Sequence, residues 1–432
     1  MMLIAAALAL LPFVFTLHID VKRGGGPGFV STKNSQFFLN GQPFPFTATN
    51  AYWLHQLSDV DIANTMASIE AGGLKVITTH AFDDVVNEPP SDGATYFQLF
   101  QGGKITLNPS GLKRLDALVQ WAEHYGLKLV MTLTGNWYPS TEGVSNPKPH
   151  GGADVYVQQL STSGFHDAFY TDPTIINAFK NYVRTVVTRY TNSTAILSWQ
   201  IMDDPQCAST LPASPSCTAQ TLIDWHNDIY NFIKSIDSNH LVSTGDTWFY
   251  YESEPVYPGK RRDEKRTSAL SSRAAPSLDY GASQIVSHPG TGGTSYGRWE
   301  PTQQLIDSGN AFIDQLAATA ASWGIPVTLT SLGVVTRSNA AYYIPRNSSE
   351  AVPPPPGAYF PTDEDQGLIY TAWFAETRTT SFGGLTQYQW SQSNLDDPGT
   401  NPIIVNGQSP NDGYAATPEA IRALELNAQL QV

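Results

Sequence analysis

The chain has 432 residues, of which 41% are hydrophobic and 14% are charged, and its formal net charge is -14. A chain of this length and apolar content can bury a large core, and one barrel domain can take up most of it. The acidic balance argues against nucleic-acid binding, because a phosphate backbone requires a basic surface. Abundant Tyr, Trp and Phe with few charges favour a neutral, hydroxyl-rich ligand that stacks on aromatic rings.

The N-terminus predicts export. Residues 1–17 form an apolar run that is too short to span a membrane comfortably, so we predict a secretory signal peptide and no membrane anchor. The usual basic residues at its start are missing. A dibasic pair, Lys22-Arg23, allows a short pro-segment to about residue 23. A secreted chain would be glycosylated at its two acceptor triplets, which begin at Asn192 and Asn347.

Short apolar runs then alternate with helical patterns, which is typical of βα units around a parallel sheet. The predicted strands cover residues 44–53, 75–82, 128–136, 195–204, 241–246, 326–333 and 384–390, with one more between 282 and 299. The predicted helices cover residues 62–71, 112–125, 173–190, 221–236, 301–323, 368–379 and 418–431. We therefore predict an α/β protein with a single-domain (β/α)8 TIM barrel, whose active site lies at the carboxyl ends of the strands.

Three stretches between these elements look irregular, at residues 140–164, 250–275 and 336–365. A further loop, rich in Pro, Ser and Thr, separates Cys207 from Cys217. In an oxidising compartment this pair predicts a local disulfide, and two free thiols are the alternative. A zinc site is disfavoured because no cluster of Cys or His accompanies the pair, and no metal or cofactor is expected.

Six segments in order resemble the fungal endo-β-1,4-mannanases of glycoside hydrolase family 5. They are residues 49–53, 166–173, 177–190, 196–207, 235–242 and 408–414. The resemblance implies a family 5 barrel over residues 37–432. It also implies a secreted, monomeric protein whose ligand is a β-mannan, glucomannan or galactomannan.

Both catalytic glutamates of that family are substituted here. The family's fourth strand ends in a motif similar to Trp-Glu-(Leu/Ile)-Ala-Asn-Glu-Pro, whose Asn contacts the sugar 2-hydroxyl and whose second Glu is the general acid/base. Asp203 and Asp204 occupy these two places. The seventh strand carries Glu-Glu-(Tyr/Phe)-Gly, and its second Glu, the nucleophile, falls on Ser331. The family's arginine on the second strand, which holds the nucleophile ionised, falls on Thr78.

These changes are costly for a retaining glycosidase, which needs two carboxyl groups about 5–5.5 Å apart. Asp204 keeps a carboxyl group but is one methylene shorter, whereas Ser331 offers a neutral hydroxyl with no apparent base. The sequence therefore predicts a mannan-recognising protein with impaired or absent hydrolysis. Two alternatives stay open. One is a weak hydrolase that uses Asp204 as acid with a water or a relocated carboxylate, and the other is a scaffold that has lost sugar binding. The loop carboxylates that could take over the role of the missing nucleophile are Glu252, Glu254 and Glu300.

The groups that would contact sugar survive at or near strand ends, where aromatic faces stack on pyranose rings and amides bind hydroxyls. The candidates are Trp53, Asn136, Trp137, Asp203 and Tyr388. Tyr388 takes the place of the family's sugar-stacking Trp. For each aromatic residue the alternative is packing beneath a loop. His80 has three possible roles, as a sugar contact, as a base, or as a hydrogen-bonded wall residue.

Overall fold

The computed structural model describes residues 26–90, 93–136, 151–245, 249–250, 270–271, 281–286, 302–344, 351, 360–380, 382–396, 404 and 406–431. Several predicted features lie outside the described residues. They are the signal peptide and pro-segment, Trp137, the acceptor Asn347, and the loop carboxylates Glu252, Glu254 and Glu300.

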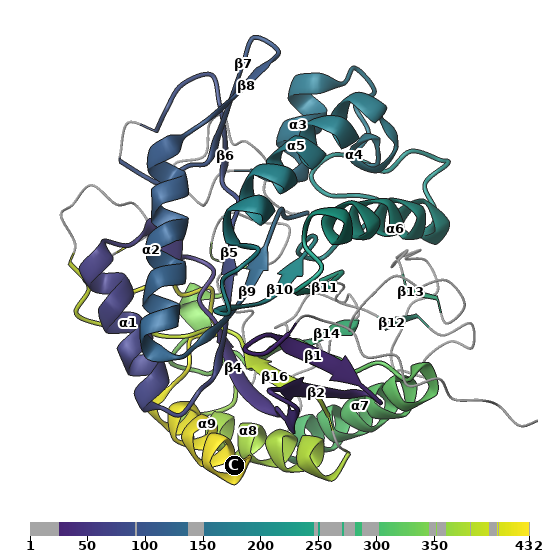
Figure 1. Cartoon of the computed structure of the whole chain (residues 1–432). Helices are drawn as coiled ribbons and strands as arrows, with labels where there is room; N and C mark the ends of the chain where they lie inside the picture. The colour runs from purple at the N-terminus through teal and green to yellow at the C-terminus, as the bar shows by residue number, and fades with distance from the viewer. Residues whose placement is uncertain are drawn as a thin grey trace, which may run out of the picture.

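Eight parallel strands form the centre of the fold (Figure 1). In chain order they are β4 (Phe46–Asn50), β5 (Val76–His80), β9 (Lys128–Thr132), β10 (Ile196–Gln200), β11 (Leu241–Ser243), β14 (Gly281–Val286), β15 (Val327–Gly333) and β16 (Gly384–Gln387). Their order in the sheet is β11-β10-β9-β5-β4-β16-β15-β14, and every pairing is parallel. Apart from β11 and β14, which are not paired in the described residues, successive strands of this sheet are neighbours, and β16 returns beside β4, as in a (β/α)8 barrel. The predicted fold class is confirmed, and β14 lies at the start of the interval left for the eighth strand.

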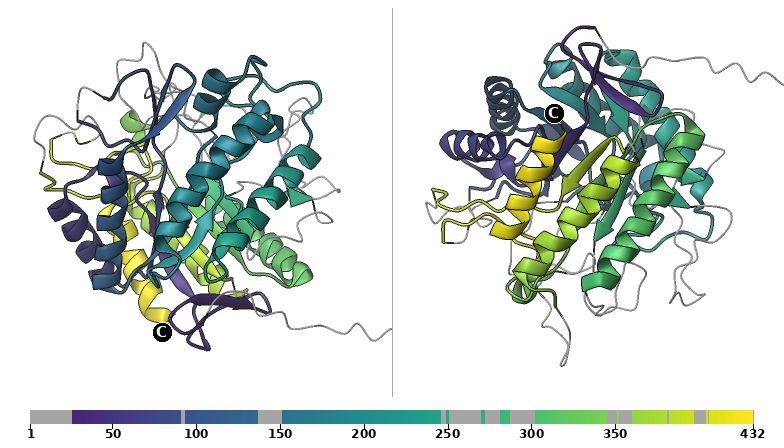
Figure 2. Two further views of the ribbon diagram at one scale, coloured as in Figure 1. Left: turned by 45° about the horizontal axis from the view of Figure 1, so that its top comes forward. Right: turned by 90° about the horizontal axis from the view of Figure 1, so that it is seen from below.

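Helices surround this sheet (Figures 1 and 2). They are α1 (Asp59–Ala71), α2 (Pro109–Tyr125), α5 (Pro173–Tyr190), α6 (Ala219–Ile236), α7 (Thr302–Trp323), α8 (Asp363–Thr379) and α9 (Pro418–Leu430). Several begin earlier than apolar periodicity predicts, because polar capping residues start the first turn. Ser58 accepts from the Asp61 amide, and Thr362 accepts from the Asp365 amide. Such caps stabilise a helix by about 1 kcal/mol each.

Further elements decorate the ends of the barrel. An antiparallel sheet of β1 (Val30–Lys33), β2 (Gln36–Leu39) and β3 (Gln42–Pro43) crosses the amino-terminal end of the strands (Figure 1). Val30 and Phe37 from this sheet pack against apolar side chains at the starts of the barrel strands, including Phe46 and Val76. This sheet closes the bottom of the barrel, so the opposite edge is the one available for a ligand.

The loops at the carboxyl edge carry secondary structure that the sequence patterns do not reveal. After β5 comes a sheet of β6 (Asp84–Val86), β7 (Gln98–Gln101) and β8 (Lys104–Leu107). The expectation that residues 140–164 are irregular is wrong for α3 (Ala153–Leu160), a helix too short to give a clear period, which is followed by α4 (Ala168–Thr171). The remaining short elements are η1 (Leu54–Gln56), β12 (Phe249–Tyr250), β13 (Leu270–Ser271) and η2 (Ala340–Tyr342). In the described part of the chain, no helix combines the length and apolarity needed to cross a membrane.

Candidate active site

The predicted site residues follow the carboxyl ends of the barrel strands, which meet at one edge of the sheet. Trp53 follows β4, Asn136 follows β9, Asp203 and Asp204 follow β10, and Tyr388 follows β16. Ser331 lies within β15, the strand next to β16. The barrel therefore brings together the described residues that the sequence assigned to the site.

Asp204 is held by backbone contacts with a neighbouring strand. Its amide donates to the Gly245 carbonyl, beyond β11, at 3.1 Å. Gly245 has a φ of +80°, and an added Cβ would lie 1.9 Å from the Met202 carbonyl oxygen, so only glycine fits there. Asp204 itself is 2% exposed and has a φ of +54°. A non-glycine residue in this region costs on the order of 1–3 kcal/mol, and such strain is concentrated at functional sites.

The backbone of Asp203 forms hydrogen bonds with the segment that follows β9. Its amide donates to the Thr134 carbonyl at 2.9 Å, and its carbonyl accepts from the Asn136 amide at 3.0 Å. The two acidic residues are thus fixed between the ends of β9 and β11. This placement fixes the backbone of Asp204 at the carboxyl edge of the sheet.

Ser331 is buried in the middle of the opposite half of the sheet, with 6% of its surface exposed. Its Cα pairs with that of Gln284 on β14, and on the other side the Tyr388 amide donates to the carbonyl of the adjacent Leu332 at 2.8 Å. A hydroxymethyl group therefore stands on the strand to which the resemblance assigns the nucleophile. Thr78, in the place of the family's arginine, is also buried on β5, at 4% exposure.

Asn136 makes several hydrogen bonds within the protein. Its side chain is fully buried, and its amide nitrogen donates to the Ala208 carbonyl at 3.2 Å. Its amide oxygen accepts from the Gln206 backbone at 3.2 Å and from the Tyr170 hydroxyl at 3.3 Å. In this geometry Asn136 fastens the segment after Asp204 to the end of β9. Its amide oxygen already accepts two bonds, so a direct bond to a sugar would fall to the second N–H of its amide nitrogen.

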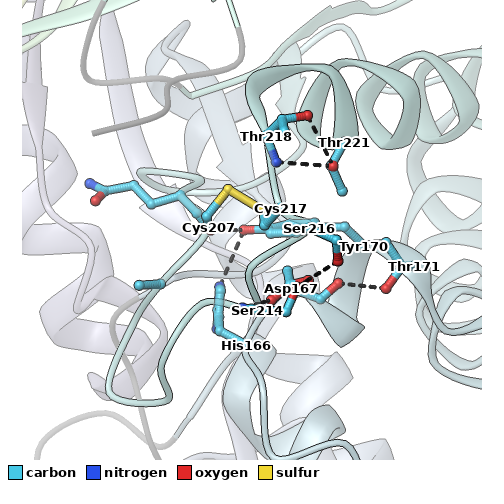
Figure 3. The surroundings of a disulfide bond; sticks show 12 residues. His166, Asp167, Tyr170, Thr171, Cys207, Ser214, Ser216, Cys217, Thr218 and Thr221 are labelled. Atoms are coloured by element: carbon cyan, nitrogen blue, oxygen red, sulfur yellow. Dashed lines mark hydrogen bonds between the residues drawn. A yellow bond between two sulfur atoms is a disulfide. The ribbon is translucent and has the colours of Figure 1, made fainter. Parts of the chain in front are cut away.

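The segment after Asp204 is closed by the predicted disulfide, Cys207–Cys217, which the structure confirms with a Cα–Cα distance of 5.8 Å (Figure 3). Asp167 accepts from the amide and the hydroxyl of Ser214, each at 2.6 Å, and anchors the same loop to α4.

Behind Asp167, a buried Asp154–His166 pair lies 2.5 Å apart and supports the loop through the contacts of Asp154 with Thr210 and Leu211. Burial alone would raise the pKa of Asp154, but the hydrogen bond and charge of His166 outweigh it and lower that pKa. The loop beside the candidate acid is therefore rigidly fixed.

The aromatic candidates differ in exposure. Trp53 is 1% exposed, and its indole N–H has no hydrogen-bond partner among the described residues. Tyr388 is half-buried and keeps part of its surface accessible. Of these two described aromatic residues, Tyr388 is thus the better placed to stack on a ligand without rearrangement.

His80 lies in an aromatic wall at the end of β5. Its ring centroid is 4.4 Å from that of Phe82 and 5.3 Å from that of Tyr52, and its side chain is 4% exposed. Burial, assisted by the nearby His55, lowers the pKa of His80 to about 3, so the ring is uncharged at neutral pH. Behind it, the Asp83 carboxylate contacts His55 Nε2 at 3.0 Å, a buried pair that sequence patterns did not single out.

One motif that carries the resemblance proves to be structural. Asp237 accepts from the Trp199 indole at 2.9 Å and contacts His240 Nδ1 at 2.5 Å, and His240 Nε2 lies 2.8 Å from the Ser193 carbonyl oxygen. These contacts join β10 to the end of α6. In the described ranges, no group of three or more His, Cys, Asp or Glu is arranged to hold a metal ion.

Comparison with known proteins agrees with this architecture. A family model described as glycoside hydrolase family 5, β-mannosidase-like, matches residues 27–344. The chain belongs to this family. Among the chain's relatives, mannan endo-1,4-β-mannosidase A of Aspergillus aculeatus is 33% identical over 318 residues, which cover 71% of this chain and 74% of the relative. A probable mannan endo-1,4-β-mannosidase A of Aspergillus niger is 31% identical over 311 residues, covering 71% and 73%.

Solved structures support the family 5 fold. The endo-1,4-β-mannanase of Rhizomucor miehei superposes with a TM-score of 0.71 at 23% identity, covering 93% of this chain and 99% of that one. An endo-β-1,4-mannanase of Thermotoga petrophila gives a TM-score of 0.65 at 20% identity, covering 90% and 77%. At these identities the likeness concerns the fold. The family and the barrel inferred from sequence motifs are therefore confirmed.

Proposed function

We propose that this family 5 chain recognises β-1,4-mannan-type polysaccharide at the carboxyl edge of its barrel and has little or no hydrolytic activity. Recognition of mannan is supported by relatives that are named mannan endo-1,4-β-mannosidases and that this chain matches over most of their length. Plain mannan, glucomannan and galactomannan all present the neutral pyranose rings that suit a chain rich in aromatic residues and with few charges.

The loss of hydrolysis rests on one observation, the buried hydroxyl of Ser331 on β15. Retention requires a carboxylate to attack the anomeric carbon while a second carboxyl group protonates the leaving oxygen. A neutral serine supplies no negative charge to the developing oxocarbenium ion, and each 1.4 kcal/mol lost there slows the reaction about tenfold. The shorter Asp204 adds to the loss, since a displacement of about 1 Å costs on the order of 100-fold.

Thr78 fits the same proposal. A buried arginine is stable when it is paired with an anion and costs several kcal/mol when it is not. If the nucleophile carboxylate has been replaced by Ser331, an arginine at position 78 would lack its partner. A small neutral residue at 78 is thus the expected companion of a serine at 331.

A weak hydrolase is the second candidate, and the conformation of Asp204 favours it. Asp204, which the resemblance assigns to the acid position, is buried in a strained backbone geometry, and its amide is bonded to the Gly245 carbonyl. With a water on the other face of the sugar, or a carboxylate from another loop, Asp204 would serve as acid in an inverting or altered mechanism.

We extend the proposal to the protein's secretion, its oligomeric state and its glycosylation. An export signal at residues 1–17 and a monomeric family 5 domain over residues 37–432 fit a protein that meets polysaccharide outside the cell. Asn192, exposed between α5 and β10, is accessible for glycosylation.

Two measurements on the purified full chain test the proposal. Calorimetry with mannohexaose should detect binding, with cellohexaose as the control for nonspecific stacking. A reducing-end assay on galactomannan should show no release above that of a heat-inactivated sample. Robust release would favour the second candidate, and absence of mannohexaose binding would refute recognition.

A further inference from the structure

Two tyrosines and one carboxylate from distant parts of the chain meet at the carboxyl edge. The Tyr388 hydroxyl donates to Asp412 Oδ2 at 2.7 Å, and the Tyr52 hydroxyl donates to the same oxygen at 3.2 Å. The two rings are nearly parallel, with an interplanar angle of 16° and centroids 6.4 Å apart. Asp412 is separated from Tyr52 by 360 positions in sequence, so only the tertiary fold brings them together.

The carboxylate of Asp412 is itself held in place. Its backbone amide donates to the side-chain oxygen of the buried Gln389 at 2.7 Å, and its carbonyl accepts from the Ile344 amide at 3.2 Å. The preceding Asn411 accepts from the Gly413 amide at 2.8 Å, which fixes the turn. Asp412 is therefore a fixed acceptor, half-buried, rather than a mobile surface acid.

The tyrosines differ in what they present to a ligand. Tyr52 is 7% exposed and packs against His80, whereas Tyr388 is half-buried and lies over Tyr52. Tyr388 also meets Tyr414 in an edge-to-face contact, with ring centroids 5.7 Å apart. Tyr388 is thus the accessible ring of an aromatic stack whose lower members are buried.

A phenol bonded to a fixed carboxylate loses the freedom to swing its ring, and charge-assisted bonds of this kind are stronger than neutral ones. Ring stacking on the C–H face of a pyranose depends on the ring being already oriented, because ordering it on binding reduces affinity. Both phenols donate to Asp412, so its oxygens are engaged before any sugar arrives.

We propose that Asp412 is a positioning residue that fixes Tyr388, with Tyr52 beneath it, as the sugar-stacking platform of this site. The platform takes one neutral pyranose unit of a mannan-type chain. This inference rests on the proposed function, since it assigns a platform to the same ligand.

The test measures mannohexaose affinity by calorimetry in matched variants. Tyr388→Ala should weaken binding at least about tenfold, and Asp412→Ala about three- to tenfold. The control Glu364→Ala removes one exposed carboxylate in the first turn of α8 and should leave affinity unchanged. In a Tyr52→Phe/Tyr388→Phe background, Asp412→Ala should have no further effect, because its route to the sugar runs through the two hydroxyls.

Two results would overturn the inference while the proposed function stands. In one, the parent protein binds mannohexaose and Asp412→Ala binds it equally well. In the other, Asp412→Ala loses the same affinity in the double phenylalanine background, which would mean that Asp412 contacts the sugar directly.

Ring fixation is checked without any ligand, by fluorine NMR of fluorotyrosine incorporated at position 388. The parent should give one narrow resonance, and Asp412→Ala should give a broadened or split one. An unchanged narrow resonance would refute the positioning role even if the protein binds no mannan. If the resonance is narrow in the parent and broadened or split in Asp412→Ala, but the parent does not bind mannohexaose, the proposed function is refuted. The assignment of a mannan-type ligand to the platform is then refuted as well.

Discussion

Restoring the missing groups in combination should recover turnover where restoring one does not. Ser331→Glu places a carboxyl group at a position that is 6% exposed, where burial raises the pKa of a carboxyl group by as much as about 3–5 units. If the pKa rises from about 4.3 to about 7, only about 1% of the group is ionised at pH 5. Thr78→Arg supplies the opposite charge that favours ionisation, and Asp204→Glu restores the acid's missing methylene.

We therefore expect neither Ser331→Glu nor Asp204→Glu alone to release reducing ends from galactomannan above background. The triple variant with Thr78→Arg should exceed Ser331→Glu by at least about 100-fold at pH 5, the factor set by ionisation alone. Thr330→Glu, one residue away on the same strand and 7% exposed, is the matched control and should stay inactive in the same background. Thermal unfolding of each variant checks that it folds.

Two outcomes would refute this reasoning. A robust gain from Ser331→Glu alone would show that the arginine is not needed for ionisation. A triple variant that folds and binds mannan yet stays inactive would show that these three positions do not account for the loss.

Three further predictions follow from buried groups. Burial lowers the pKa of His226 to about 3. As the pH falls below 6.5, the unfolded chain therefore binds a proton on His226 while the folded chain does not. The contribution of His226 to the free energy of unfolding is complete above pH 6.5 and is lost between pH 6.5 and 3. Between pH 6.5 and 4.5 the parent should lose about 2 kcal/mol more unfolding free energy than His226→Leu or His226→Gln in urea titrations, and parallel curves would contradict this. Replacing both Cys207 and Cys217 by Ser should lower the free energy of unfolding by about 2–3 kcal/mol, because the disulfide closes a loop with a sequence separation of 10 in the unfolded chain. An unchanged unfolding midpoint would contradict this prediction. Asn136→Ala should lower the free energy of unfolding by about 1–3 kcal/mol, because it leaves the Gln206 amide and the Ala208 carbonyl without their partner. A loss of mannohexaose affinity at unchanged stability would instead support a direct contact between Asn136 and the sugar.

The barrel was predictable because its strands are short apolar runs at regular intervals, and each leaves a signal in its own sequence. The resemblance assigned Asp203, Asp204 and Ser331 to the site, and the fold explains why they follow or lie in neighbouring strand ends, since a parallel sheet gathers its carboxyl ends at one edge. The disulfide was predictable because only two cysteines exist and they are close in sequence.

Features that depend on distant partners were not predictable. Asn136 has the residue type of a sugar ligand, and only its contacts with Tyr170, Gln206 and Ala208 reveal that it fastens a loop. The pairing of Tyr52 with Asp412 spans nearly the whole chain and leaves no local pattern. Likewise α3 is held by contacts such as the 3.0 Å bond from the Ala153 amide to the Gly135 carbonyl rather than by a long apolar period.

The central proposal is that this family 5 protein holds mannan without cutting it, because Ser331 stands on β15 at the position that the resemblance assigns to the nucleophile carboxylate. The most direct test is a crystal structure of the parent protein soaked with mannohexaose. We predict an intact oligosaccharide stacked on Tyr388, with the Ser331 hydroxyl and no carboxylate on the face opposite Asp204. Cleaved sugar, or a carboxylate about 5–5.5 Å from that of Asp204, would contradict the account.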